Sequence, residues 1–125
     1  MTRGHPPLAA IRDAKKFAEK MGYQWEENTH PELGYHLLIF KPDSLRLIMV
    51  RVVRHAIGAE VFYEELMPDE IAAMRTLPFP AWIPREIWLR TQHERSFRRL
   101  WVQELSIGEI GFWNPDGYVN PHAKD

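Results

Sequence analysis

The sequence predicts one α/β domain in which helices flank a mixed sheet. Two apolar stretches joined by Lys41-Pro42-Asp43-Ser44 are typical of two strands in a hairpin. The second stretch is apolar on both faces in its middle, which indicates a central strand covered from both sides. A helical segment then leads to a further strand, and such a crossover allows parallel pairing. The expected order is α-β-β-β-α-β-β.

Hydrophobic periodicity assigns each element in turn. An amphipathic helix is expected over Leu8–Met21, preceded by two prolines and ended by Gly22. A second helix is expected over Pro68–Leu77, because its first turn carries a proline and two acids. The expected strands are Tyr23–Glu27, Tyr35–Lys41, Leu45–Arg54, Ile87–Thr91 and Leu100–Leu105, with an edge strand at Ile107–Trp113 and a polar connection at Gln92–Arg99. We expect the domain to span residues 1–113 and residues 114–125 to form a loose tail.

Composition narrows the classes of function. A chain of 125 residues can bury one core, and its net charge of −1 means that any basic surface must be local. The absence of cysteine excludes disulfides and cysteine-based zinc sites. No apolar run approaches the roughly 20 residues that span a bilayer, and the first residues lack the apolar core of a signal peptide. We therefore expect a cytoplasmic protein without a membrane partner.

The predicted hairpin carries two short segments at a distinctive spacing. Gly34-Tyr35-His36 leads into its first strand, and Met49-Val50-Arg51 lies in its second strand. In this spacing, and in the order of its elements from about Leu8 to Leu105, the chain resembles the PD-(D/E)XK, or restriction-endonuclease-like, superfamily. The compact prokaryotic relatives of the Holliday-junction-resolvase type are the most similar. The resemblance implies an α-β-β-β-α-β core, here with an extra C-terminal strand.

The resemblance also implies that the nuclease motif is degenerate. His36 takes the position of the motif's Asp, Met49 that of its Glu and Arg51 that of its Lys. In active relatives the two acids hold Mg²⁺, which requires oxygen ligands that a thioether cannot replace. Arg51 stays protonated and so cannot act as a general base. The resemblance therefore implies no catalytic residue, no metal and no cofactor at this place.

Structural roles compete with functional ones at the same three residues. For His36 the structural explanation is a hydrogen-bonded histidine near the core, and for Met49 it is core packing; in both cases this explanation is the favoured one. Arg51 lies among apolar residues, so it must pair with an acid or reach a cleft. An ion pair with Glu19 or Glu26 is as well supported as a contact with phosphate.

Arginines supply the candidates for nucleic-acid contact. The segment from residue 90 to residue 99 holds four arginines between Trp88 and Trp101, with Phe97 as a candidate stacking group. A solvated hairpin loop explains the same segment. The candidate nucleic-acid-binding residues are Arg51, Arg54, Arg90, Arg95, Arg98 and Arg99.

Three functions remain open. The leading hypothesis is an inactive nuclease-like domain that binds DNA or RNA. The second is an active Mg²⁺-dependent nuclease whose acids have moved to Glu26, Glu60 or Glu64. The third is a homodimeric interaction module without a nucleic-acid role. It would use the aromatic residues of the C-terminal half, which are Trp82, Trp88, Trp101, Phe112, Trp113 and Tyr118.

Overall fold

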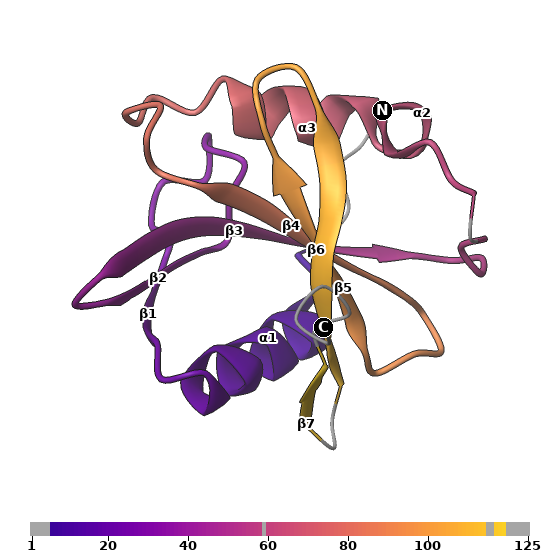
Figure 1. The fold of residues 1–125 in the computed structure, drawn as a ribbon, viewed down its shortest axis with the longest axis horizontal. Coiled ribbons are helices and arrows are strands. Elements are labelled where there is room, and N and C mark those ends of the chain that lie inside the picture. Colours follow the sequence, from indigo (N-terminus) through magenta and orange to yellow (C-terminus); the bar gives the residue numbers. More distant parts are fainter. Residues whose placement is uncertain (1–5, 59, 115–116, 120–125) are drawn as a thin grey trace, which may run out of the picture.

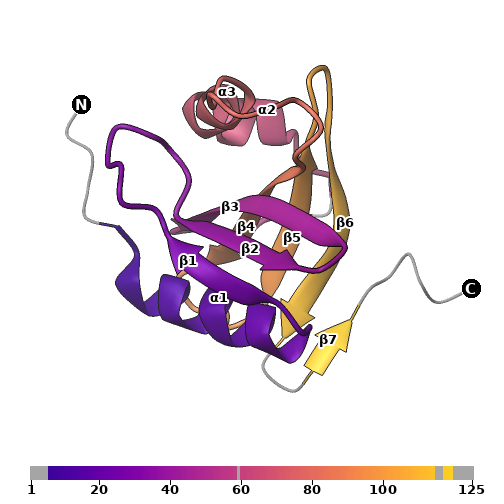
Figure 2. The ribbon, with the colours of Figure 1, turned by 90° about the vertical axis from the view of Figure 1, so that its left-hand side faces the viewer.

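The centre of the protein is a seven-stranded mixed sheet between two helical layers (Figure 1). The computed structural model describes residues 6–58, 60–114 and 117–119. Helix α1 (Leu8–Lys20) covers one face of the sheet, and helices α2 (Tyr63–Leu66) and α3 (Pro68–Arg75) lie on the other (Figure 2). The α/β class and the mixed, helix-flanked sheet agree with the prediction.

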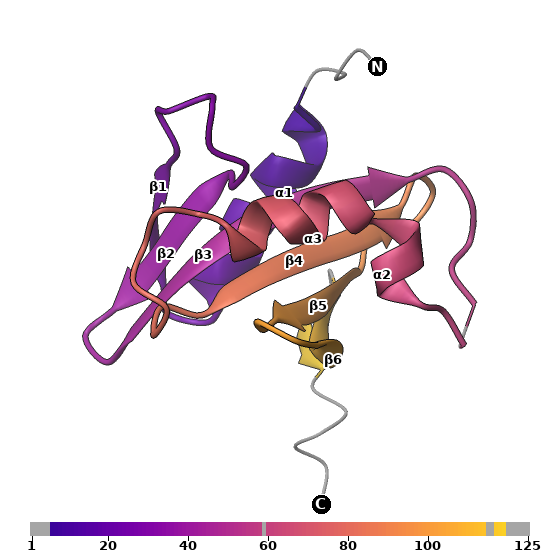
Figure 3. The same ribbon diagram turned by 90° about the horizontal axis from the view of Figure 1, so that it is seen from above.

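The strands lie side by side in the order in which they occur in the sequence. Their bounds are β1 Gln24–Glu27, β2 Leu37–Lys41, β3 Ser44–Val53, β4 Arg85–Thr91, β5 Phe97–Val102, β6 Ile107–Asn114 and β7 Gly117–Val119. Every neighbouring pair is antiparallel except β3 and β4, which are parallel. Helices α2 and α3 form the crossover between those two strands, as the sequence predicts (Figure 3).

Strand β3 is buried from both sides in its middle. Ile48 and Val50 join the core under α1, whereas Leu47 and Met49 join the core under α3. The prediction of a central strand covered on both faces is therefore confirmed. No helix in the described part of the chain is long and apolar enough to cross a membrane.

The C-terminal strands differ from the expectation. The expected polar connection at Gln92–Arg99 is wrong in its last three residues, because β5 already begins at Phe97 and ends at Val102. Phe97 is fully buried and packs edge-to-face on Phe17, with 5.8 Å between ring centroids. The expected loose tail is wrong for residues 117–119, which pair with β6 as strand β7. Asn114, the first residue of that tail, belongs to β6, and residues 115–116 and 120–125 lie outside the described part of the chain.

Candidate functional site

A groove of about 750 Å³ lies where β3 continues past the end of β2. The pairing of these strands ends at Leu37 and Ile48, yet β3 continues to Val53 (Figure 3). The groove is bounded by the start of α1, by the loop between β1 and β2, and by the start of α3. His36, Met49 and Arg51 all line it, so the three positions of the degenerate motif meet at one place.

His36 takes over the role of a strand partner at this point. Its main-chain N–H donates to the carbonyl of Ile48 at 2.8 Å, and its side-chain Nδ1 accepts the N–H of Val50 at 2.8 Å. A main-chain N–H can only donate, so Nδ1 carries no proton and the ring proton lies on Nε2. Burial lowers the pKa of His36, which favours the same neutral form. The imidazole thus completes the ladder where the carbonyl of a neighbouring strand is missing.

Arg51 pairs with Glu70 on α3. Its Nε lies 2.8 Å from Glu70 Oε2, and its Nη1 donates to the carbonyl of Val52 at 2.6 Å. The expected partners Glu19 and Glu26 are both wrong, since Arg51 projects toward the α3 side of the sheet. Glu19 instead accepts a hydrogen bond from the indole of Trp25. The Arg51 side chain remains 40% exposed, so it reaches the groove while it is paired.

Met49 has the structural role that was weighed against a functional one. It is 6% exposed and belongs to the core under α3. Its Cε would lie 3.3 Å from a Cβ atom at Gly34, and the Cβ of Ala73 would lie 3.1 Å away. Gly34 therefore lets the loop before β2 pack closely against α3 and Met49 at the edge of the groove.

The charge of the groove is mainly negative. Among the lining residues that the structure describes, Glu27, Asp69 and Glu70 are acidic and Arg51 is the one cation. Glu27 pairs with Lys15 from α1, and Glu70 pairs with Arg51. Asp69, the third acid, has no cation partner among the described residues. Sequence reasoning assigned Asp69 and Glu70 only to the helix dipole. The signal for their role was the crossover, which returns the start of α3 to the end of β3.

The acids named for a relocated nuclease site lie elsewhere. Glu26 is exposed on β1, and with burial it raises the pKa of Tyr35. Glu60 is exposed, and Glu64 pairs with Arg75 at 2.8 Å. None of these three acids lines the groove. Among the residues that the structure describes, no three His, Asp or Glu side chains gather as they would around a metal ion.

Two of the candidate arginines belong to the interior. Arg90 is 9% exposed and donates to Asp13 of α1 at 2.9 Å, with its guanidinium 4.7 Å from the centre of the Phe97 ring. Arg99 is 6% exposed and binds both carboxylate oxygens of Glu86. The side chains of Arg90, Arg99 and Phe97 are thus enclosed within the fold, which leaves little of their surface accessible to a nucleic acid.

Of the remaining candidate arginines, one is hydrogen-bonded and two have no partner among the described residues. Arg98 is partly buried and donates to the hydroxyl of Tyr63 and to the carbonyl of Ile57. Arg54 and Arg95 are exposed, and neither side chain has a partner among the described residues. Arg54 and Arg95 both follow the C-terminal ends of β3 and β4, which end side by side, since the N–H of Gln92 donates to the carbonyl of Val53 at 2.9 Å.

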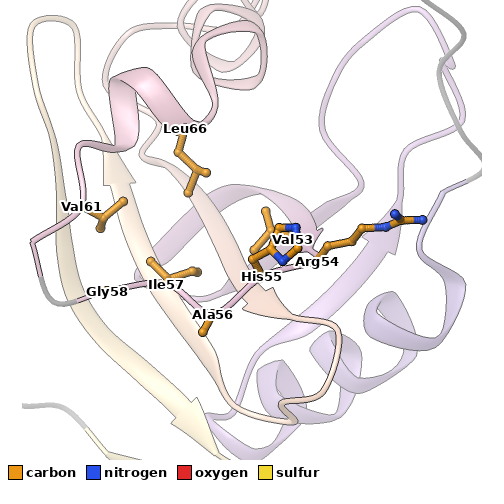
Figure 4. Close-up of a pocket in the computed structure, with 8 residues that line it drawn as sticks. All are labelled: Val53, Arg54, His55, Ala56, Ile57, Gly58, Val61 and Leu66. Atoms are coloured by element: carbon orange, nitrogen blue, oxygen red, sulfur yellow. The ribbon is translucent and has the colours of Figure 1, made fainter.

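A smaller hollow of about 180 Å³ lies beside the end of β3. Ile57, Val61 and Leu66 give it an apolar wall, and Figure 4 shows the Arg54 side chain extending away from that wall. Arg54, which follows the end of β3, therefore extends into solvent next to the exposed residue His55.

The aromatic residues of the C-terminal half are not equally accessible. Trp88 is fully buried, whereas Trp82 is 72% and Trp101 is 39% exposed. The side chains of Phe112, Trp113 and Tyr118 lie outside the described part of the structure.

Comparison of the chain with protein-family models, with curated proteins and with solved structures finds no significant match.

Proposed function

We propose that this chain is a domain of nuclease-like fold that binds nucleic acid and does not cleave it with a metal. The order α1-β1-β2-β3-α2-α3-β4, in which α2 and α3 together form one helical crossover, supports the restriction-endonuclease-like part of the proposal. The meeting of His36, Met49 and Arg51 in one groove supports it further. The chemistry of these side chains argues against Mg²⁺ binding, since a thioether and a paired guanidinium offer no anionic oxygen.

The observation that carries the binding proposal is that Arg54 and Arg95, which follow the C-terminal ends of β3 and β4, have exposed guanidinium groups without a partner among the described residues. Arg54 follows the end of β3, and Arg95 lies in the turn after β4. Exposed guanidinium groups without acid partners are suited to phosphate oxygens, because no ion pair must be broken first. The chain as a whole is slightly acidic, so these two arginines form a local basic feature.

A salt series of binding to single-stranded, duplex and branched DNA tests the proposal. Affinity should fall steeply as salt rises, because phosphate contacts release counterions. Arg54→Gln and Arg95→Gln should each lower the salt slope by about 1. Lys41→Gln is the control, since Lys41 is the last residue of β2 and pairs with Ser44 at the opposite end of β3, and it should leave the slope unchanged. Absence of binding to all three DNAs at low salt would contradict the proposal.

Incubation with Mg²⁺ or Mn²⁺ separates this proposal from an active nuclease. We expect no cleavage of DNA or RNA that a chelator abolishes. Cleavage that is also lost in Asp69→Asn and Glu70→Gln would mean that the acids of the groove form a metal site, and the binding-only proposal would then be wrong.

Self-association is the second candidate function. Trp82 and Leu105 are 72% and 91% exposed, so both side chains are accessible to a partner, and exposed tryptophan is enriched in protein interfaces. Light scattering after size exclusion should then give a dimer that Trp82→Ser dissociates. A strict monomer at high concentration would remove this candidate.

A further inference from the structure

The groove contains an unpaired edge of the central strand. Along β3 the odd-numbered residues pair with β4: the Leu47 N–H donates to the carbonyl of Pro84, and the carbonyl of Val53 accepts from Gln92. The main-chain groups of the even-numbered residues point the other way, as the bond from His36 N–H to the Ile48 carbonyl shows. Because β2 begins at Leu37, which pairs with Ile48, it provides no partner for later residues of β3. The main-chain groups of Val50 and Val52 therefore face the groove.

Side chains cap half of this edge. The N–H of Val50 is bound by His36 Nδ1 at 2.8 Å, and the carbonyl of Val52 is bound by Arg51 Nη1 at 2.6 Å. The carbonyl of Val50 and the N–H of Val52 have no partner among the described residues. In a parallel pair, one residue donates its N–H to a carbonyl of the neighbouring strand and accepts, at its C=O, the N–H of the residue two positions further along. The free carbonyl of Val50 and the free N–H of Val52 have this spacing. An edge with this spacing is a template for an added strand.

The walls of the groove define the side chains that such a strand would carry. Leu8 and Ile11 of α1 lie on one side and Ala73 of α3 on the other, so alternate side chains of an extended segment would meet apolar surface. Asp69 and Glu70 add negative charge at the start of α3. A basic segment complements these carboxylates, whereas an acidic segment or a phosphate chain would be repelled.

We propose that the groove binds an extended peptide segment of alternating apolar and basic residues, which pairs with Val50 and Val52 of β3. The occupant is a segment of a partner protein, held by main-chain hydrogen bonds and by the acids of α3. This inference does not depend on nucleic-acid binding, which uses Arg54 and Arg95 outside the groove.

Amide hydrogen exchange with a designed peptide tests the inference. The probe is an acetylated and amidated peptide of about six residues, a usual strand length, in which valine and lysine alternate. At a saturating concentration it should slow exchange of the Val52 amide at least about tenfold, because that N–H becomes hydrogen-bonded. Amides of the turn between β5 and β6, such as Leu105, should not change. The same peptide methylated on alternate main-chain nitrogens keeps its charge but loses donors, and it should protect Val52 much less.

Charge variants give a second measurement. Asp69→Asn should weaken peptide binding about two- to fivefold at low salt, as expected for one exposed charge pair. Glu65→Gln removes an equally exposed acid on α2, outside the groove, and should leave the affinity unchanged. The inference is overturned if millimolar peptide leaves Val52 exchange unchanged, or if the methylated peptide protects it equally. It is also overturned if a single-stranded oligonucleotide, rather than the peptide, protects Val52.

Discussion

The two ends of β3 use the same ion pair in opposite surroundings. Near its start, Arg46 lies 2.7 Å from Glu86, which is fully buried and also binds Arg99. Near its end, Arg51 lies 2.8 Å from Glu70, and both side chains are partly exposed. The two N–O distances are almost equal, so the pairs differ mainly in how far solvent reaches the carboxylate: Glu86 is fully buried, whereas Glu70 is partly exposed. An enclosed pair cannot be broken without leaving a charge in the interior, whereas an exposed pair can exchange its partner for water or for a ligand.

The carboxylate at the enclosed end is fully bonded. Glu86 binds two arginines and the indole N–H of Trp88, so both of its oxygens are occupied. At the open end, two main-chain groups of β3 have no partner among the described residues. The first end therefore contributes to the register of three strands, and the second leaves binding groups available.

Removal of the central charge at the closed end should have the largest effect. Glu86→Gln keeps the shape of the side chain but leaves Arg46 and Arg99 without their countercharge. We expect the free energy of unfolding to fall by about 3–5 kcal/mol, measured by urea denaturation. A loss below about 1 kcal/mol would mean that solvent already compensates the two arginines, and the contrast between the ends would disappear.

Removal of the imidazole at the open end should have an intermediate effect. His36→Ala leaves the N–H of Val50 without an acceptor, and we expect a loss of about 1–3 kcal/mol in thermal or urea unfolding. His36→Asn is the matched control, because its side-chain oxygen can take the place of Nδ1. Equal losses in both variants would show that the hydrogen bond to Val50 contributes little.

The same histidine should make stability depend on pH. The pKa of His36 is lowered in the folded state, so below about pH 6.5 the unfolded chain binds a proton that the folded chain does not. The stabilisation is therefore complete above that pH and is lost as the pH falls toward the folded-state pKa. The difference in unfolding free energy between wild type and His36→Asn isolates this group from the nearby carboxylates. A difference independent of pH between 7 and 5 would contradict the role of neutral Nδ1.

The exposed pair should have the smallest effect on stability. Glu70→Gln removes the countercharge of Arg51, but water can solvate the guanidinium, which is 40% exposed. We expect a loss of at most about 1 kcal/mol in urea denaturation. A loss as large as that of Glu86→Gln would show that Arg51 is held as part of the core.

The parts of the fold that follow from local pattern could be predicted. The apolar run of β3 and the prolines at the starts of α1 and α3 act within a few residues, so a sequence window contains them. Burial of charge could not be predicted in this way. Arg90 and Asp13 are 77 residues apart, and Arg46 and Glu86 are 40 apart, so each arginine looks solvent-exposed in its own segment. This is why the polar stretch before Arg99 was expected to be a connection.

The candidate site was predictable in position more than in chemistry. The spacing of His36, Met49 and Arg51 places them together, but it contains no information about the helix that packs over them. Asp69 and Glu70 lie at the start of α3, and they line the groove only because the crossover packs this helix next to the end of β3. That packing is tertiary and cannot be read from a short stretch of sequence. One usable signal was length, because the expected strand Leu45–Arg54 is longer than its expected hairpin partner Tyr35–Lys41. In the structure β2 has 5 residues and β3 has 10, so half of β3 lacks an antiparallel partner from the hairpin.

The order of strands has a consequence for synthesis on the ribosome. Each strand lies beside the one translated just before it, so a newly emerged strand always finds its neighbour already made. Only β4 must wait for intervening helices, because its parallel pairing needs the crossover. The sheet can therefore grow from β1 toward β7 by addition at a single margin, without any earlier pair having to open.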